Sequence, residues 1–121
     1  MDIWDLIIES IQTGTVIPKP EARSDFRVHH FGMRRGEEAM VYTIPNNKNA
    51  SKPYQKGITR SEFKMAFDRL QSDGHLTRKW WAQNLSDCAK EGGCNFTTIG
   101  GIFEILGKAA YDGRNQGYRL L

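Results

Sequence analysis

Basic residues surround an aromatic side chain near the middle of the chain. Lys48, Lys52 and Lys56 stand on either side of Tyr54. Lysine side chains contact phosphates and a tyrosine ring stacks on a base, so this combination suits nucleic-acid binding. The alternative is a solvated loop in which Tyr54 packs onto the core. Both interpretations stay open at the level of the sequence.

Further basic residues follow in predicted helices and in a predicted turn. They are Arg60, Lys64, Arg78, Lys79 and Arg114. Two of them precede the adjacent pair Trp80-Trp81, whose side chains lie about 100° apart on a helix. One Trp can therefore fill the core while the other lies at its rim, and an exposed Trp could stack on a base or enter a partner interface.

Two cysteines and two adjacent histidines are the other reactive side chains. Cys88 and Cys94 are six positions apart, which is wider than a zinc-binding pair, and no second pair exists. Neighbouring side chains on a strand point to opposite faces, so we expect His29 and His30 to serve separate sites. We predict two free, buried or partly buried thiols, with a disulfide or a metal site as the alternatives.

No recognised catalytic or cofactor motif stands out. The chain lacks a glycine-rich phosphate loop of the Walker or Rossmann type. A His with a distant carboxylate could act as an acid–base pair, but three His and fourteen carboxylates make such a pairing easy to find by chance. We predict no catalytic residue, no metal and no cofactor, and a binding function rather than an enzyme.

Length, composition and charge set further limits. The 121 residues are 39% hydrophobic and suit a single globular domain over 1–121. Acidic residues stand where a signal peptide would be positive, and no apolar run reaches the about 20 residues of a membrane span, so we expect a cytoplasmic protein. Residues 46–121 hold twelve Lys/Arg and seven Asp/Glu. This excess favours an anionic partner, although a solvated surface of mixed charge explains it too.

Apolar spacing predicts the elements that would position these residues. The sequence predicts an α+β fold: four short helices and two β-hairpins that form one small antiparallel sheet. The helices are expected over 3–11, 59–73, 77–85 and 97–106, and the strand pairs over 26–31 with 40–44 and 108–111 with 118–121. Residues 45–57 and 86–95 are expected to be loops.

Several residues predict where these elements begin, end and pack. Thr59 and Glu62 form a capping box, and Thr97 or Thr98 is expected to cap the last helix. Gly100 and Gly101 in its first turns indicate that another segment, or a ligand, approaches the helix closely.

The succession of helices and a closing hairpin over residues 59–121 resembles winged-helix proteins. This resemblance implies DNA or RNA as the partner, with Arg114 at the hairpin tip reaching a groove or a phosphate and a helix before it contacting bases. The last helix carries Glu104 and no Lys or Arg, which is unfavourable for reading a major groove. We therefore expect the surface to be built from the helices that carry the other basic residues and from the 46–57 loop.

A competing prediction is a homo-oligomer, for example a homodimer, that binds a small molecule or a protein. An exposed C-terminal strand can pair edge to edge with its symmetry mate, and aromatic side chains can line a pocket. The candidate residues are apolar or aromatic: Trp4, Ile8, Trp80, Trp81 and Tyr118.

Overall fold

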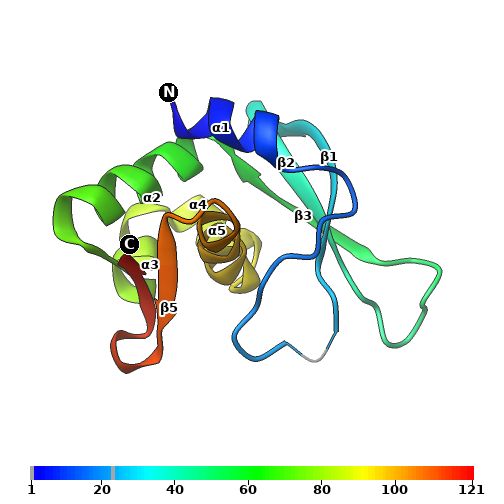
Figure 1. Ribbon diagram of the computed structural model, residues 1–121. Helices are drawn as coiled ribbons and strands as arrows, with labels where there is room; N and C mark the ends of the chain where they lie inside the picture. The colour runs from blue at the N-terminus through cyan, green and yellow to red at the C-terminus, as the bar shows by residue number, and fades with distance from the viewer. Residues whose placement is uncertain (1, 23) are drawn as a thin grey trace.

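A computed structural model describes residues 2–22 and 24–121 of the chain. Within these residues it has five α-helices and two three-stranded antiparallel sheets, which confirms the α+β class (Figure 1). None of the described helices has the length and apolarity to cross a membrane. The elements in chain order are α1 (Ile3–Ser10), β1 (Arg27–Arg34), β2 (Glu37–Ile44), β3 (Tyr54–Thr59), α2 (Arg60–Asp73), β4 (His75–Thr77), α3 (Arg78–Asn84), α4 (Ser86–Glu91), α5 (Cys94–Ile105), β5 (Ala109–Asp112), a 3₁₀ turn η1 (Gly113–Asn115) and β6 (Gly117–Leu120).

The first sheet has the strand order β1-β2-β3. Strands β1 and β2 form the predicted hairpin, and Arg35 and Gly36 take the positive φ angles that its tight turn requires. The prediction that residues 45–57 form a loop is wrong for 54–57, because β3 pairs with β2 from Tyr54 to Thr59. Strand β3 lies at the sheet edge with its first residues exposed, so it lacks the alternation that marks a half-buried strand.

The second sheet has the order β4-β6-β5, so the C-terminal strand β6 lies in its centre. The strands thus form two sheets rather than the single sheet that the sequence predicts. Helix α5 lies between the first sheet and the β5–β6 hairpin, which keeps the two sets of strands apart (Figure 1). Strand β4 was not expected, because three residues are too few to show a periodic pattern.

The helix boundaries follow local capping chemistry. Thr59 and Glu62 form the predicted capping box at the start of α2, and Gly74 ends the helix with a φ angle of 81°. Helix α5 begins at Cys94 without a side-chain cap, so the prediction that Thr97 or Thr98 caps it is wrong. The segment predicted as a loop over 86–95 contains α4, whose single buried residue gives no amphipathic signal.

Helix α5 is the centre of the hydrophobic core. Its side chains Phe96, Ile99, Ile102 and Phe103 are buried, and one cluster of buried residues joins them to both sheets and to α1 and α2. Burial of most of this helix accounts for its apolar composition.

Candidate functional site

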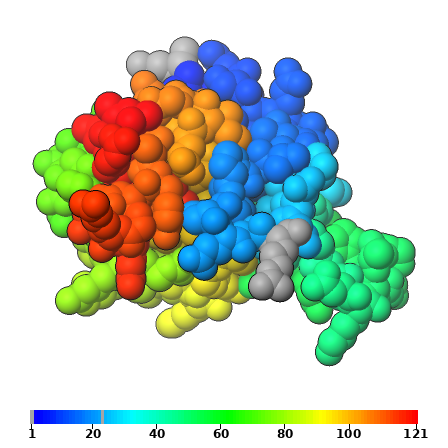
Figure 2. All heavy atoms as spheres, turned by 60° about the horizontal axis from the view of Figure 1, so that its bottom comes forward, coloured from blue at the N-terminus to red at the C-terminus, as the bar shows by residue number. Residues whose placement is uncertain are grey.

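A cleft of about 480 Å³ opens between the segment after α1, the first turn of α5 and the β5–β6 hairpin. Figure 2 looks onto this side of the molecule, with the hairpin at the left and the N-terminal segment beside it. The side chains that line the cleft include two cations, two aromatic rings, a thiol and a hydroxyl: Lys19, Arg78, Phe26, Tyr111, Cys94 and Thr97.

Lys19 ties the N-terminal segment to α5. Its Nζ donates to the carbonyl oxygen of Cys94 at 2.8 Å and to the hydroxyls of Thr97 and Thr98 at 2.9 and 2.7 Å. Burial lowers the pKa of Lys19 to about 7, Cys94 opposes this effect, and the positive charge of Arg78 adds to it. Sequence reasoning missed Lys19, because a lysine between two prolines in a connector gives no signal of a long-range contact.

Arg78 presents a second positive charge to the cleft. Its Cζ lies 4.9 Å from the ring centroid of Phe96 and 5.6 Å from that of Trp81, and its Nη1 donates to the carbonyl oxygen of Gly93 at 2.9 Å. No carboxylate among residues 2–22 and 24–121 lies within ion-pair distance of this guanidinium. The stacking holds the group in place and leaves its charge without a counter-ion.

A polar network behind the cleft joins α4 and α5 to the first sheet. The Tyr42 hydroxyl donates to Asn95 Oδ1, and Asn95 Nδ2 donates to Glu91 Oε1 at 2.9 Å. The same carboxylate oxygen accepts the amide of Gly57 at 3.1 Å. Burial acts to raise the pKa of Glu91, but these hydrogen bonds and the charge of Arg35 outweigh it, so the pKa lies below its usual value.

The two cysteines are free thiols, as predicted. Cys88 is buried, and burial raises its pKa to about 12, so the thiol stays protonated. Cys94 is partly exposed at the cleft and lies 3.3 Å from the Tyr42 hydroxyl. No cluster of three or more metal-binding side chains occurs in the described parts of the chain.

His29 and His30 do not point to opposite faces as predicted. Their Nδ1 atoms lie 2.6 Å apart, and the two rings meet edge to face. The cause is a β-bulge, which shifts the register of β1 between Val28 and His30 and interrupts the alternation of side chains. Both rings are exposed.

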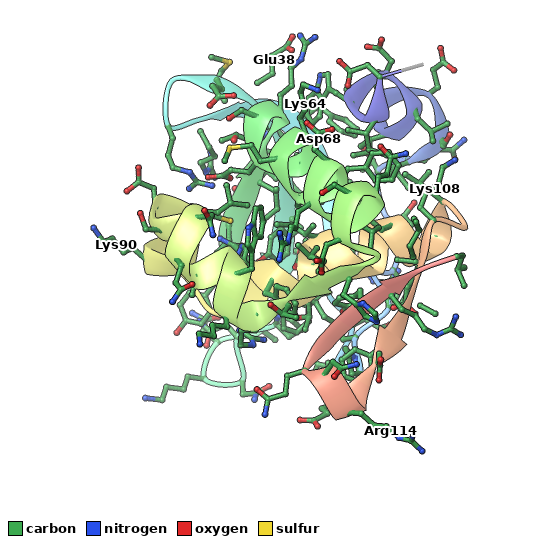
Figure 3. The ribbon with its side chains drawn as sticks, turned by 90° about the vertical axis from the view of Figure 1, so that its left-hand side faces the viewer. Glu38, Lys64, Asp68, Lys90, Lys108 and Arg114 are labelled. Atoms are coloured by element: carbon green, nitrogen blue, oxygen red, sulfur yellow. The ribbon has the colours of Figure 1, made fainter. Side chains whose placement is uncertain are left out.

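Some of the predicted basic residues lie on one side of the molecule. The 45–53 loop, which carries Lys48 and Lys52, and the turn that carries Arg114 project in the same direction (Figures 1 and 3). Both loops are exposed, and Tyr54 at the base of the first is 55% exposed. Tyr54 therefore does not pack onto the core.

The other predicted basic residues have different surroundings. Arg60 lies within 3.3 Å of Glu38 and 3.7 Å of Asp2, and Lys64 lies 3.3 Å from Asp68. Figure 3 shows Lys64 and Asp68 at one end of the molecule and Arg114 at the other. Lys56 Nζ donates to the carbonyl oxygen of Glu91, and Lys79 is exposed on α3.

The residues proposed for an oligomer contact or a pocket are mostly internal. Trp4, Trp81 and Tyr118 are buried, Trp80 is partly buried beneath the Arg69 guanidinium, and Ile8 is 45% exposed. Strand β6 is paired on both sides, so the expected edge-to-edge pairing of the C-terminal strand is wrong. The homo-oligomer itself stays a prediction.

Comparison of the chain with known protein families, with curated proteins and with solved structures found no match.

Proposed function

We propose that this protein binds nucleic acid through the face formed by residues 18–22, 45–53 and 113–116, which we call the loop face. The observation that carries the proposal is the projection of basic loops from one side of the molecule, next to a cleft that is lined by Lys19 and Arg78. A cluster of positive charge of this kind suits a phosphate backbone.

Three basic side chains of the loop face form no ion pair within the described part of the chain. Lys48, Lys52 and Arg114 have no carboxylate within ion-pair distance in the described part of the chain, whereas Arg60 and Lys64 do. A cation that already has a protein counter-ion gains less from a phosphate, because the existing pair must be broken or shared. We therefore exclude Arg60 and Lys64 from the proposed binding surface.

The succession of α2, α3, α4 and α5 before the β5–β6 hairpin supports the resemblance to winged-helix proteins, with Arg114 at the hairpin tip. The burial of α5 distinguishes this chain from a protein that inserts its last helix into a groove. Contacts made by lysines and arginines of loops position the protein on phosphates and carry no sequence information. We therefore propose binding that depends little on sequence.

The test compares two charge-reversal pairs with the same change in net charge. We would measure the binding of a fluorescent 20-nucleotide strand, alone and as a duplex, by anisotropy at low salt. K48E/R114E removes two cations from the loop face and should weaken binding at least about tenfold.

The matched control is R60E/K64E, which reverses two cations outside the loop face and should change the affinity less than about threefold. Circular dichroism would establish that both variants are folded. Equal losses of affinity in the two variants would mean that binding follows net charge alone, and the loop face would be wrong as the binding surface.

A further inference from the structure

We infer that the cleft beside the β5–β6 hairpin binds a nucleoside phosphate, with the base against the ring of Tyr111 and the phosphate at Arg78. The choice of a nucleoside among aromatic anions rests on the proposed function. The unit can come from a free mononucleotide or from an unstacked nucleotide of a bound single strand, and the experiment below separates these two sources.

The size and walls of the cleft suit a planar ring with a polar substituent. Its volume of about 480 Å³ lies within the range of about 300–1,000 Å³ that is usual for small-ligand sites. Tyr111 on β5 is 39% exposed, and its ring meets Tyr118 edge to face at 5.5 Å, which leaves part of it open to a ligand. Base–aromatic stacking accepts any base, so this wall fits a nucleoside without requiring a particular one.

The basic side chains of the cleft favour an anionic ligand. Arg78 uses its Nη1 for the Gly93 carbonyl, and its Nε and Nη2 make no hydrogen bond within residues 2–22 and 24–121. These two N–H groups can form the paired contact with phosphate oxygens that guanidinium groups favour. Among the residues that the structure describes, Glu21 is the only carboxylate that lines the cleft, and it is exposed.

Lys19 places a second basic group at the cleft, whose protonated form a bound anion would stabilise. Its three hydrogen bonds keep the ammonium group beside Phe26, with Nζ 4.5 Å from the ring centroid. Burial removes water from around this ammonium group and so lowers the pKa of Lys19 to about 7. A phosphate in the cleft would stabilise the protonated amine, so binding near neutral pH would take up a proton.

The experiment titrates the wild-type protein with a 5′-nucleoside monophosphate, the parent nucleoside and ribose 5-phosphate. Isothermal calorimetry in two buffers with different ionisation enthalpies would measure affinity and proton uptake. Fluorescence of Trp81, whose ring lies 5.5 Å from Phe96 at the cleft, provides a second readout. We expect the monophosphate to bind at least about tenfold more tightly than either fragment, with proton uptake at pH 7.

Variants locate the site. R78Q keeps a donor for the Gly93 carbonyl but removes the charge, and should weaken monophosphate binding about tenfold or more. Y111L keeps an apolar side chain but removes the aromatic ring, and should weaken monophosphate binding about threefold or more. K64Q, far from the cleft, should change nothing. Absence of monophosphate binding, or binding that R78Q and Y111L leave unchanged, would overturn the inference.

The same variants distinguish this inference from the proposed function. If strands bind in a K48E/R114E-sensitive manner while the monophosphate does not bind, the loop face stands and the cleft inference is wrong. If the monophosphate binds in an R78Q-sensitive manner and no strand binds, the cleft takes free nucleotides and the proposed nucleic-acid binding is wrong. Loss of single-strand affinity in Y111L would show that the cleft takes its nucleotide from the strand.

Discussion

The ring of Tyr118 on β6 lies directly on Gly100 of α5, so that a Cβ at Gly100 would overlap the ring. Tyr118 is fully buried and also packs against Phe96. The missing side chain at Gly100 is therefore what lets the central helix and the closing hairpin come together.

Substitution of Gly100 should reveal this contact. In a solvated helix, Gly→Ala is stabilising by about 1 kcal/mol. Here we expect G100A to destabilise the protein by about 1–3 kcal/mol, because the methyl group must displace the Tyr118 ring. Urea unfolding followed by tryptophan fluorescence would measure this. In a Y118L background the same substitution should cost less, and a stabilising effect of G100A in the wild type would contradict the packing.

The pKa of Lys19 predicts how stability depends on pH. A lysine in the unfolded chain titrates near 10.5, whereas in the folded protein the pKa of Lys19 is about 7. Between these values the unfolded state holds more protons, so the free energy of unfolding should rise with pH above about 7. K19M should flatten this rise by on the order of 1 kcal/mol between about pH 6.5 and 8.5.

The control for this prediction is K90Q, which changes an exposed lysine and should keep the wild-type pH dependence. Chemical denaturation of the three proteins across this pH range provides the comparison. Identical pH profiles for K19M and the wild type would show that Lys19 titrates normally in the folded state.

The ion pair between Arg35 and Glu62 should contribute to stability through the buried carboxylate. Arg35 Nε donates to Glu62 Oε2 at 2.9 Å, its Nη2 donates to Oε1 at 2.6 Å, and Oε1 also accepts the Thr59 amide of the capping box. R35Q leaves the Glu62 charge without its partner and should cost about 2–3 kcal/mol.

A second substitution separates the charge from the capping box. R35Q/E62Q should recover part of the lost stability, because a glutamine can still accept the Thr59 amide and has no charge to bury. Thermal unfolding would compare the two variants. If the double variant is less stable than R35Q, the unpaired charge is not the cause of the loss.

Local signals in the sequence predicted much of the second half of the fold. The capping box of α2 and the closing hairpin follow from neighbouring residues and appear in the structure. The glycines of α5 predicted a close approach, and the structure places Tyr118 on Gly100 and the Pro18 carbonyl next to Gly101.

Contacts between distant parts of the chain could not be predicted in this way. The hydrogen bonds from Lys19 to Thr97 and Thr98 join residues more than 70 positions apart, and no pattern in the sequence near Lys19 predicts them. The cleft has no sequence motif, because four separate segments of the chain build it. The β-bulge that brings His29 and His30 together could not be predicted either, because the prediction assumed that side chains alternate strictly along the strand.

The measurement that tests nucleic-acid binding most directly is the salt dependence of affinity for a short strand. Release of counter-ions predicts a straight line of log affinity against log salt concentration, with a slope of about −0.7 per phosphate neutralised on a single strand. The wild type should show a slope near −2 to −3, and K48E/R114E should make it shallower by about 1.4. Binding that does not change between low and moderate salt, or its absence at low salt, would contradict the account.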